Sequence, residues 1–203
     1  MKRTTNIQEK AKSIFLRNGG ILRAKEAIDA GIHPRTLYQL LDIGAIVRLC
    51  RGIYRLASLE QLGNPDFISV SKRVPDSVIC LISALAFYDI TTQIPHEIHI
   101  AIERESRSPR IKYPPVRIFK FKGKAFTEGV QNNRIDGYSV HIYSPEKTLA
   151  DCFKYRNKIG MDTVIEALKL YSERKKVKVN ELIYYSKICR VEKVMRPYLE
   201  SII

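Results

Sequence analysis

The chain has 203 residues, of which 45% are hydrophobic and 28% are charged, so it is long enough for two modest domains and apolar enough to form their cores. No uninterrupted apolar stretch approaches the roughly 20 residues that cross a bilayer, and we expect no membrane span. The basic first residues lead into Gln8, Glu9 and Lys10 rather than into the apolar region of a signal peptide, which favours a cytoplasmic location.

The formal net charge is +14, from 35 lysine and arginine residues against 21 acidic ones. A charge excess of this size attracts polyanions, and nucleic acid is the most common partner of that kind. The alternative is a basic protein whose charge serves only its solubility. Residues 1–56 contain 11 basic and four acidic residues, which places half of the net charge in about a quarter of the chain. The N-terminal part is therefore the first place to look for nucleic-acid binding.

The cysteines show no spacing typical of a metal site. Cys50, Cys80, Cys152 and Cys189 lie far apart in the sequence, without the paired spacing of a zinc site or a disulfide framework. We expect reduced thiols that mostly fill the cores, with no metal ion and no other cofactor.

Apolar residues recur at helical spacing in two stretches near the start, 6–17 and 23–30. The first stretch ends at Gly19-Gly20 and the second at Gly31, which tolerates the left-handed conformation of a helix C-terminus. The residues expected to face inward are Ile7, Ala11, Ile14, Phe15, Ala24, Ala27 and Ile28.

A third helix is predicted over Pro34–Asp42, with His33 at the N-cap and Pro34 at the favoured first position. Its apolar stripe is Leu37, Leu40 and Leu41. A short helix, a glycine turn and a second helix with exposed polar residues is the layout of a helix-turn-helix, whose second helix enters the major groove. The residues expected to point away from the stripe, and so to contact DNA, are His33, Arg35, Thr36, Tyr38 and Gln39.

Two short stretches of β-branched and aromatic residues, 45–49 and 53–56, flank Cys50-Arg51-Gly52 and predict a hairpin. Arg51 lies at its tip, and Arg48 and Arg55 lie on its strands. Three guanidinium groups could straddle a phosphate backbone or reach into a minor groove, as in the wing of a winged helix-turn-helix. The alternative is a small α/β domain with solvated arginines.

The stretch from Gly20 to Leu56 resembles the N-terminal domain of AbiEi-type antitoxins from abortive-infection toxin–antitoxin systems, most closely in Leu41 to Leu56 (L..GAI.R..RGIYRL). The stretch Tyr143 to Cys152, YSPEKTLADC, resembles a segment of that family's C-terminal domain. The resemblance implies phage defence by a repressor of its own operon, which binds inverted repeats in the double-stranded DNA of its own promoter. It also implies a second domain that neutralises a nucleotidyltransferase toxin.

Similar proteins are also encoded without a toxin neighbour. A regulator or an interaction protein with no toxin, in which DNA binding is secondary, therefore stays open as the alternative.

The remainder of the chain mixes both element types. Ser144 and Pro145 predict a helix start, and the last helix is expected to bend or break at Pro197. Helices are expected over 66–73, 77–88, 144–155, 161–173, 180–188 and 191–201, and strands over 97–103, 116–121 and 138–143. The predicted fold class is α+β, with a winged helix-turn-helix over 1–60 and a mixed α+β domain over 61–203 that ends in helices.

Between Arg107 and Lys124 the chain has seven basic residues and no acidic one, with aromatic residues interleaved. This pattern suits a second nucleic-acid surface or a face for an acidic partner. The alternation in Phe119-Lys120-Phe121-Lys122 also fits an ordinary strand with one buried side, which we favour. The residues of this possible secondary basic surface are Arg107, Arg110, Lys112, Lys120, Lys122 and Lys124.

No Asp-x-Asp pair, phosphate-binding glycine loop or Ser-His-Asp spacing indicates an enzyme. The nearest candidate metal ligands are Glu97, His99, Glu103 and Glu105, but the alternation through Ile98, Ile100 and Ile102 is simpler as a strand that faces a core. We therefore expect a non-enzyme with no catalytic residues.

Overall fold

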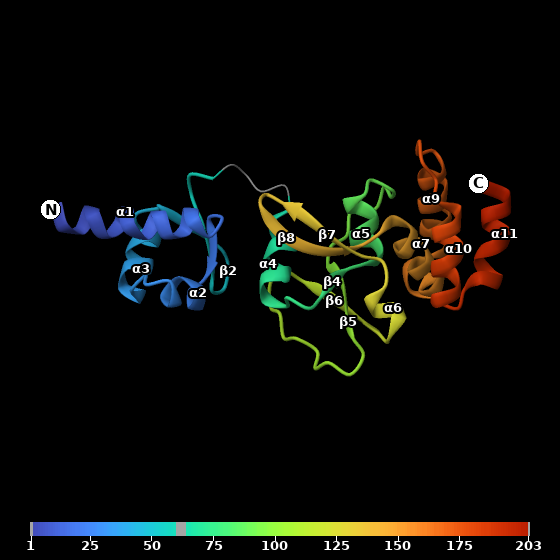
Figure 1. The fold of residues 1–203 in the computed structure, drawn as a ribbon, viewed down its shortest axis with the longest axis horizontal. Coiled ribbons are helices and arrows are strands. Elements are labelled where there is room, and N and C mark those ends of the chain that lie inside the picture. The colour runs from blue at the N-terminus through green and yellow to red at the C-terminus, as the bar shows by residue number, and fades with distance from the viewer. Residues whose placement is uncertain (1, 60–63, 203) are drawn as a thin grey trace. The chain divides into compact units, whose positions relative to one another are not determined.

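The computed structural model describes residues 2–59 and 64–202, and side chains from residue 7 onward within those ranges. The chain divides into two compact units. The first comprises Met1–Arg73 with Arg134–Tyr138, and the second comprises Val74–Asn133 with Ser139–Ile203. Both contain helices and a sheet, so the predicted α+β class is confirmed (Figure 1).

The first unit combines helices with a three-stranded antiparallel sheet of order β1-β3-β2. Ile21 of β1 pairs with Arg55 of β3, and Ile46 of β2 pairs with Leu56 of β3. The elements are α1 (Lys2–Arg17), β1 (Ile21–Arg23), α2 (Ala24–Asp29), α3 (Pro34–Asp42), β2 (Ile46–Cys50), β3 (Ile53–Leu56) and α4 (Pro65–Arg73).

The core of this unit forms where apolar faces of α1, α2 and α3 meet the sheet, with Phe15, Ala27 and Leu40 fully buried. Two residues expected to face inward do not. Ile7 is 53% exposed and Ile28 is 45% exposed. In the six-residue helix α2, Ala27 is buried and Ala24 packs partly buried against the same core, whereas Ile28 faces solvent.

The second unit is built on a five-stranded sheet of order β6-β5-β4-β8-β7, except that the last two residues of β7 and the first of β8 are grouped with the first unit. β4 pairs antiparallel with β5 and parallel with β8, and β5 pairs parallel with β6 from Ile98↔Val116 to Glu103↔Phe121. Its strands are β4 (Val78–Ile79), β5 (Ile98–Glu103), β6 (Val116–Phe121), β7 (Val130–Ile135) and β8 (Tyr138–Tyr143), with the helices α5 (Leu81–Phe87) and α6 (Lys124–Thr127) between them.

The helix predicted over 77–88 is wrong in its first part. Val78 and Ile79 form β4, which pairs with Ala101 and Ile100 of β5, and the helix begins only at Leu81. A short central strand is buried on both faces and therefore has a continuous apolar sequence, which periodicity cannot distinguish from a buried helix.

Helices complete the second unit. Figure 1 shows α7 between the sheet and the last helices, and α7 contacts α5, α9 and α10. α11 runs through Pro197 without ending there. The elements are α7 (Pro145–Lys154), α8 (Arg156–Ile159), α9 (Met161–Ser172), α10 (Val179–Ile188) and α11 (Glu192–Ile202).

All four cysteines are buried and free, in agreement with their expected place in the cores. Within the described ranges, no helix combines the length and apolar character that a bilayer crossing requires.

Candidate nucleic-acid interface

The helix α3 presents a polar face outward. Arg35 is exposed, Tyr38 is 60% exposed and Gln39 is half-buried, whereas Leu37 and Leu40 lie in the core. His33 is exposed and caps the helix, since its Nδ1 accepts a hydrogen bond from the Arg35 backbone N–H at 3.2 Å. The outward face of α3 therefore offers a guanidinium, a phenol and an amide within two helical turns.

The prediction that Thr36 points away from the core is wrong, because Thr36 is only 8% exposed. It lies one helical turn before Leu40 and so shares the inward side of α3. With Ala11 and Ile14 of α1 it lines a small hollow. With so little exposed surface, Thr36 offers less to a DNA base than Arg35 or Tyr38 does.

The β2–β3 hairpin carries the three predicted arginines in two different environments. Arg48 and Arg51 are exposed. Arg55 is half-buried, and its Nη1 donates a hydrogen bond to the Leu59 carbonyl at 2.7 Å. Arg48 and Arg51 are therefore the hairpin residues best placed to meet a phosphate backbone.

Two further arginines, which the sequence analysis did not select, support the hairpin turn: Arg73 directly and Arg23 through Arg73. Arg73 of α4 donates to the Arg51 carbonyl and lies 3.6 Å from Cys50 Sγ. Arg23 of β1 donates to the Arg73 carbonyl at 3.3 Å. These contacts brace the turn that presents Arg51. Local spacing gave no signal for them, because Arg23 and Arg73 are 50 residues apart in the sequence.

The basic residues predicted between 107 and 124 fall into two groups. Arg107, Arg110 and Lys112 are exposed in the connection between β5 and β6. Lys120, Lys122 and Lys124 line one hollow of the second unit. Phe119 and Phe121 of β6 are buried while Lys120 is exposed, so this stretch is the ordinary strand that the alternation favoured.

The segment Tyr143 to Cys152 is almost wholly buried. Ser144 caps α7, as predicted, by accepting a hydrogen bond from the Lys147 backbone N–H. Lys147 Nζ lies 2.5 Å from Asp151 Oδ2, and neither side chain is exposed. Burial raises the pKa of the Asp151 carboxyl, and the Lys147 ammonium opposes that shift. The opposite charges of Lys147 and Asp151 therefore stabilise each other inside the core.

The metal alternative finds no support in the described part of the chain, where no three His, Cys, Asp or Glu residues come close enough to hold an ion. His99 is buried, and its Nε2 lies 3.9 Å from Glu97 Oε1. Burial, and then the nearby Arg117 charge, lower the pKa of His99 to about 4. His99 is therefore neutral at neutral pH and forms no ion pair with Glu97.

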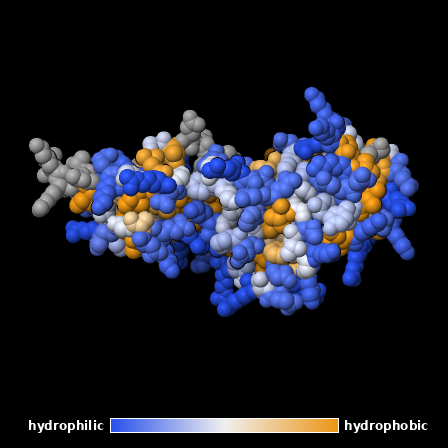
Figure 2. All heavy atoms as spheres, in the orientation of Figure 1, coloured by the Kyte–Doolittle hydropathy of each residue, from blue (hydrophilic) through white to orange (hydrophobic). Residues whose placement is uncertain are grey.

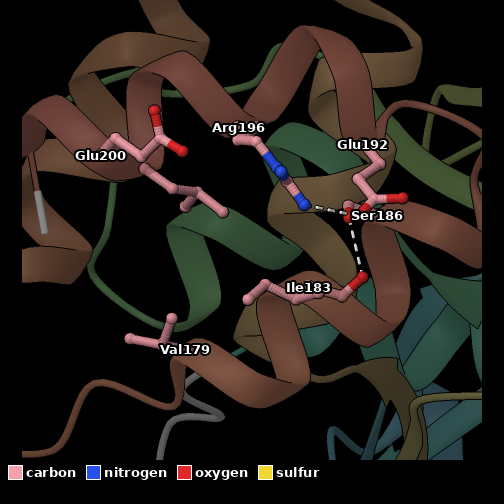
Figure 3. Close-up of a pocket in the computed structure, with 7 residues that line it drawn as sticks. Val179, Ile183, Ser186, Glu192, Arg196 and Glu200 are labelled. Atoms are coloured by element: carbon pink, nitrogen blue, oxygen red, sulfur yellow. Dashed lines mark hydrogen bonds and ion pairs between the residues drawn. The ribbon is translucent and has the colours of Figure 1, made fainter.

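A mostly apolar groove, with charged residues at its edge, lies between α10 and α11. Figure 3 shows Val179 and Ile183 on one side, with the ion pair of Arg196 and Glu192 at 3.2 Å across its upper edge. Hydrophobic side chains also gather on the surface where these helices lie (Figure 2). The groove encloses about 370 Å³.

Comparison with known proteins bears on the first unit. Residues 9–57 match the family described as "Transcriptional regulator, AbiEi antitoxin". The resemblance to AbiEi antitoxins is confirmed for this segment. The AbiEi match covers α2, α3, β2 and β3, and so includes the outward face of α3 and the hairpin with Arg48 and Arg51.

The fold also resembles that of a solved structure, which aligns with nearly the whole chain. It is the RV2827C protein from Mycobacterium tuberculosis, with a TM-score of 0.57 and 14% sequence identity over 96% of this chain and 81% of that chain. At this identity the likeness shows a common fold. A comparison with curated protein sequences found no match.

Proposed function

We propose that the first unit is a winged helix-turn-helix and that the protein is a DNA-binding transcriptional regulator. In this proposal α3 is the recognition helix in the major groove, and the β2–β3 hairpin is the wing against the phosphate backbone. The order helix, strand, helix, helix and hairpin, with β1 completing the sheet, supports the assignment. The family match to residues 9–57 supports it independently.

The observation that carries the proposal is the outward face of α3 beside a basic hairpin in one compact unit. Arginine reads guanine through O6 and N7, and glutamine reads adenine, so Arg35 and Gln39 suit base recognition. The exposed guanidinium groups of Arg48 and Arg51 suit contacts with phosphates, which position a protein without reading sequence.

The DNA that we propose is the protein's own promoter, at which it represses its own transcription. Inverted repeats there require two copies with their recognition helices about 34 Å apart, or a multiple of that distance.

The antitoxin description of the matched family favours a second role, in which the protein neutralises a nucleotidyltransferase toxin. Co-purification with the product of a neighbouring nucleotidyltransferase gene tests this role. A chain that binds its promoter and captures no such product is a stand-alone regulator.

The proposed function is tested by a gel-shift titration of the full chain against its own upstream DNA at several salt concentrations, with an unrelated fragment as competitor. Arg35→Ala is expected to weaken binding by about 1 to 3 kcal/mol and to relax sequence preference at one position. Arg51→Ala is expected to weaken binding to all sequences and to reduce the salt dependence by about one phosphate contact.

The matched control is Lys169→Ala, which removes an exposed positive charge from α9 of the second unit. It is expected to leave both affinity and salt dependence unchanged. Binding that ignores sequence, or that Lys169→Ala weakens as much as Arg35→Ala does, would contradict the proposed recognition helix.

A further inference from the structure

The second unit contains a hollow of about 710 Å³ whose lining is strongly basic. Its cationic side chains come from five separate places: the end of β5, strand β6, the turn into α6, the end of α7 and the link between α10 and α11. They are Arg104, Lys120, Lys122, Lys124, Lys154 and Arg190, and the remaining lining residues are Phe121, Ala125, Tyr155 and Ile188.

Over residues 2–59 and 64–202, no Asp or Glu side chain lines this hollow. Among the described residues, none of the six cations forms an ion pair with an Asp or Glu side chain. Lys120 Nζ donates to two backbone carbonyls, those of Arg104 at 3.2 Å and Ser106 at 3.1 Å. Like charges gathered around one concavity repel each other and raise the local concentration of anions. The hollow is therefore built for an anionic ligand carrying several charges.

Arg190 adds an independent observation, because its backbone has a φ of 58° in the left-handed region. It follows the end of α10, where its N–H bonds the Lys187 carbonyl at 3.0 Å and the Val191 N–H bonds the Ser186 carbonyl at 2.8 Å. Glycine is the usual residue at this position of the capping motif, since any side chain is strained there. Residues with a strained backbone conformation are often found at functional sites. Here the strained residue supplies one of the hollow's cations.

We propose that this hollow binds a nucleoside polyphosphate, with the six cations holding the phosphates. Its volume lies within the roughly 300 to 1,000 Å³ of small-molecule sites. Lysine and arginine both bind phosphate well. The lysine ammonium acts as a point charge, and the arginine guanidinium donates two parallel hydrogen bonds. The half-buried ring of Tyr155 and the apolar surface of Ala125 and Ile188 give the nucleoside an apolar contact beside the charges. A concave, side-chain-lined hollow of this size favours a compact ligand over a nucleic-acid duplex.

The test is isothermal titration calorimetry of the full chain, at physiological ionic strength, with ATP, GTP, CTP, UTP, pyrophosphate and a single-stranded DNA 12-mer without terminal phosphates. At least one nucleoside triphosphate is expected to bind with one-to-one stoichiometry, more tightly than pyrophosphate. Lys122→Ala and Arg190→Gly are each expected to weaken that binding roughly tenfold, because each removes a charge-assisted contact. Arg110→Ala, an exposed basic residue outside the hollow, is the matched control and is expected to bind normally.

Arg190→Gly separates a ligand contact from a structural role. Glycine relieves the left-handed strain, so the variant is expected to keep or raise the unfolding temperature while its nucleotide affinity falls. A lowered unfolding temperature with unchanged affinity would overturn the role of Arg190. Failure of every nucleotide to bind would overturn the ligand class. Tighter binding of the 12-mer, weakened by the same two variants, would instead identify the hollow as a track for nucleic-acid backbone.

Discussion

The stretches Leu41 to Leu56 and Tyr143 to Cys152 place their charged residues differently. In Leu41 to Leu56 the arginines at 48 and 51 are exposed, and the buried residues around them are apolar. In Tyr143 to Cys152 the charged residues Glu146, Lys147 and Asp151 are all buried, with exposures of 3%, 0% and 0%. The charged residues of the first stretch are therefore open to solvent, whereas those of the second lie in the core.

The partners of the buried charges show what the second motif does. Asp151 accepts from Lys147 Nζ and also from Cys189 Sγ at 3.1 Å, which joins α7 to the end of α10. Glu146 Oε1 accepts from the Tyr171 hydroxyl at 2.7 Å, which joins α7 to α9. The side chains of α7 thus fix the helices around it, and the motif serves the fold of the second unit. The exposed side chains of Arg48 and Arg51 do not join helices in this way.

The largest expected effect comes from breaking the buried pair. Asp151→Ala leaves the Lys147 ammonium buried without its counter-charge, and we expect the free energy of unfolding of the second unit to fall by about 3 to 5 kcal/mol. Urea titration followed by circular dichroism measures this loss.

The double variant Lys147→Met with Asp151→Leu is the control, because it removes both charges and keeps apolar volume. It is expected to lose much less stability than Asp151→Ala, as buried pairs replaced by packed apolar residues often do. Equal losses in the two variants would mean that the pair acts through shape rather than through charge.

A second expected effect concerns pH. Burial and Arg117 depress the pKa of His99 from 6.5 to about 4, so the folded state favours the neutral ring. The stability from this preference is fully present above pH about 6.5 and is lost as the pH falls toward 4, by about 3 kcal/mol at most. His99→Gln cannot take up the proton. Between pH 7 and pH 4 it is expected to lose less stability than the unmodified chain in urea titrations, and parallel losses would contradict the assignment.

The smallest expected effect lies on the hairpin. Arg51→Ala removes an exposed side chain, while the contact to Arg73 uses the Arg51 backbone carbonyl and survives. We expect the free energy of unfolding to change by no more than about 0.5 kcal/mol. Thermal unfolding measures this change. A large loss of stability would mean that the Arg51 side chain supports the fold, as Lys147 and Asp151 do, and would contradict the comparison.

The sequence predicted best the elements that end at residues with strong local preferences. Pro34 and Gly44 bound α3, and Ser144 with Pro145 starts α7, so both helices appear where they were expected. β7 was missed because its residues Val130–Ile135 are mostly exposed and polar, and they show no alternation. β1 was missed because three residues are too few for a period to show.

The candidate sites, too, could be predicted only where local sequence spacing decides the outcome. The face of α3 could be predicted because helical spacing alone decides which residues point outward, and it failed only at Thr36, next to the apolar stripe. The basic hollow could not be predicted as a unit. Lys120 and Lys122 were noticed for their local charge, but Lys154 and Arg190 join them only through the packing of α7 and α10 beside β6. Contacts between distant segments leave no periodic signal.

The buried thiols have a practical consequence. Cys50 lies in the first unit, and Cys80, Cys152 and Cys189 lie in the second. Burial raises the pKa of the three thiols in the second unit, which suppresses the reactive thiolate as long as that unit is folded. A thiol reagent therefore modifies each unit mainly when it opens. Mass spectrometry of the modified peptides would time the opening of the two halves separately in one unlabelled, native chain.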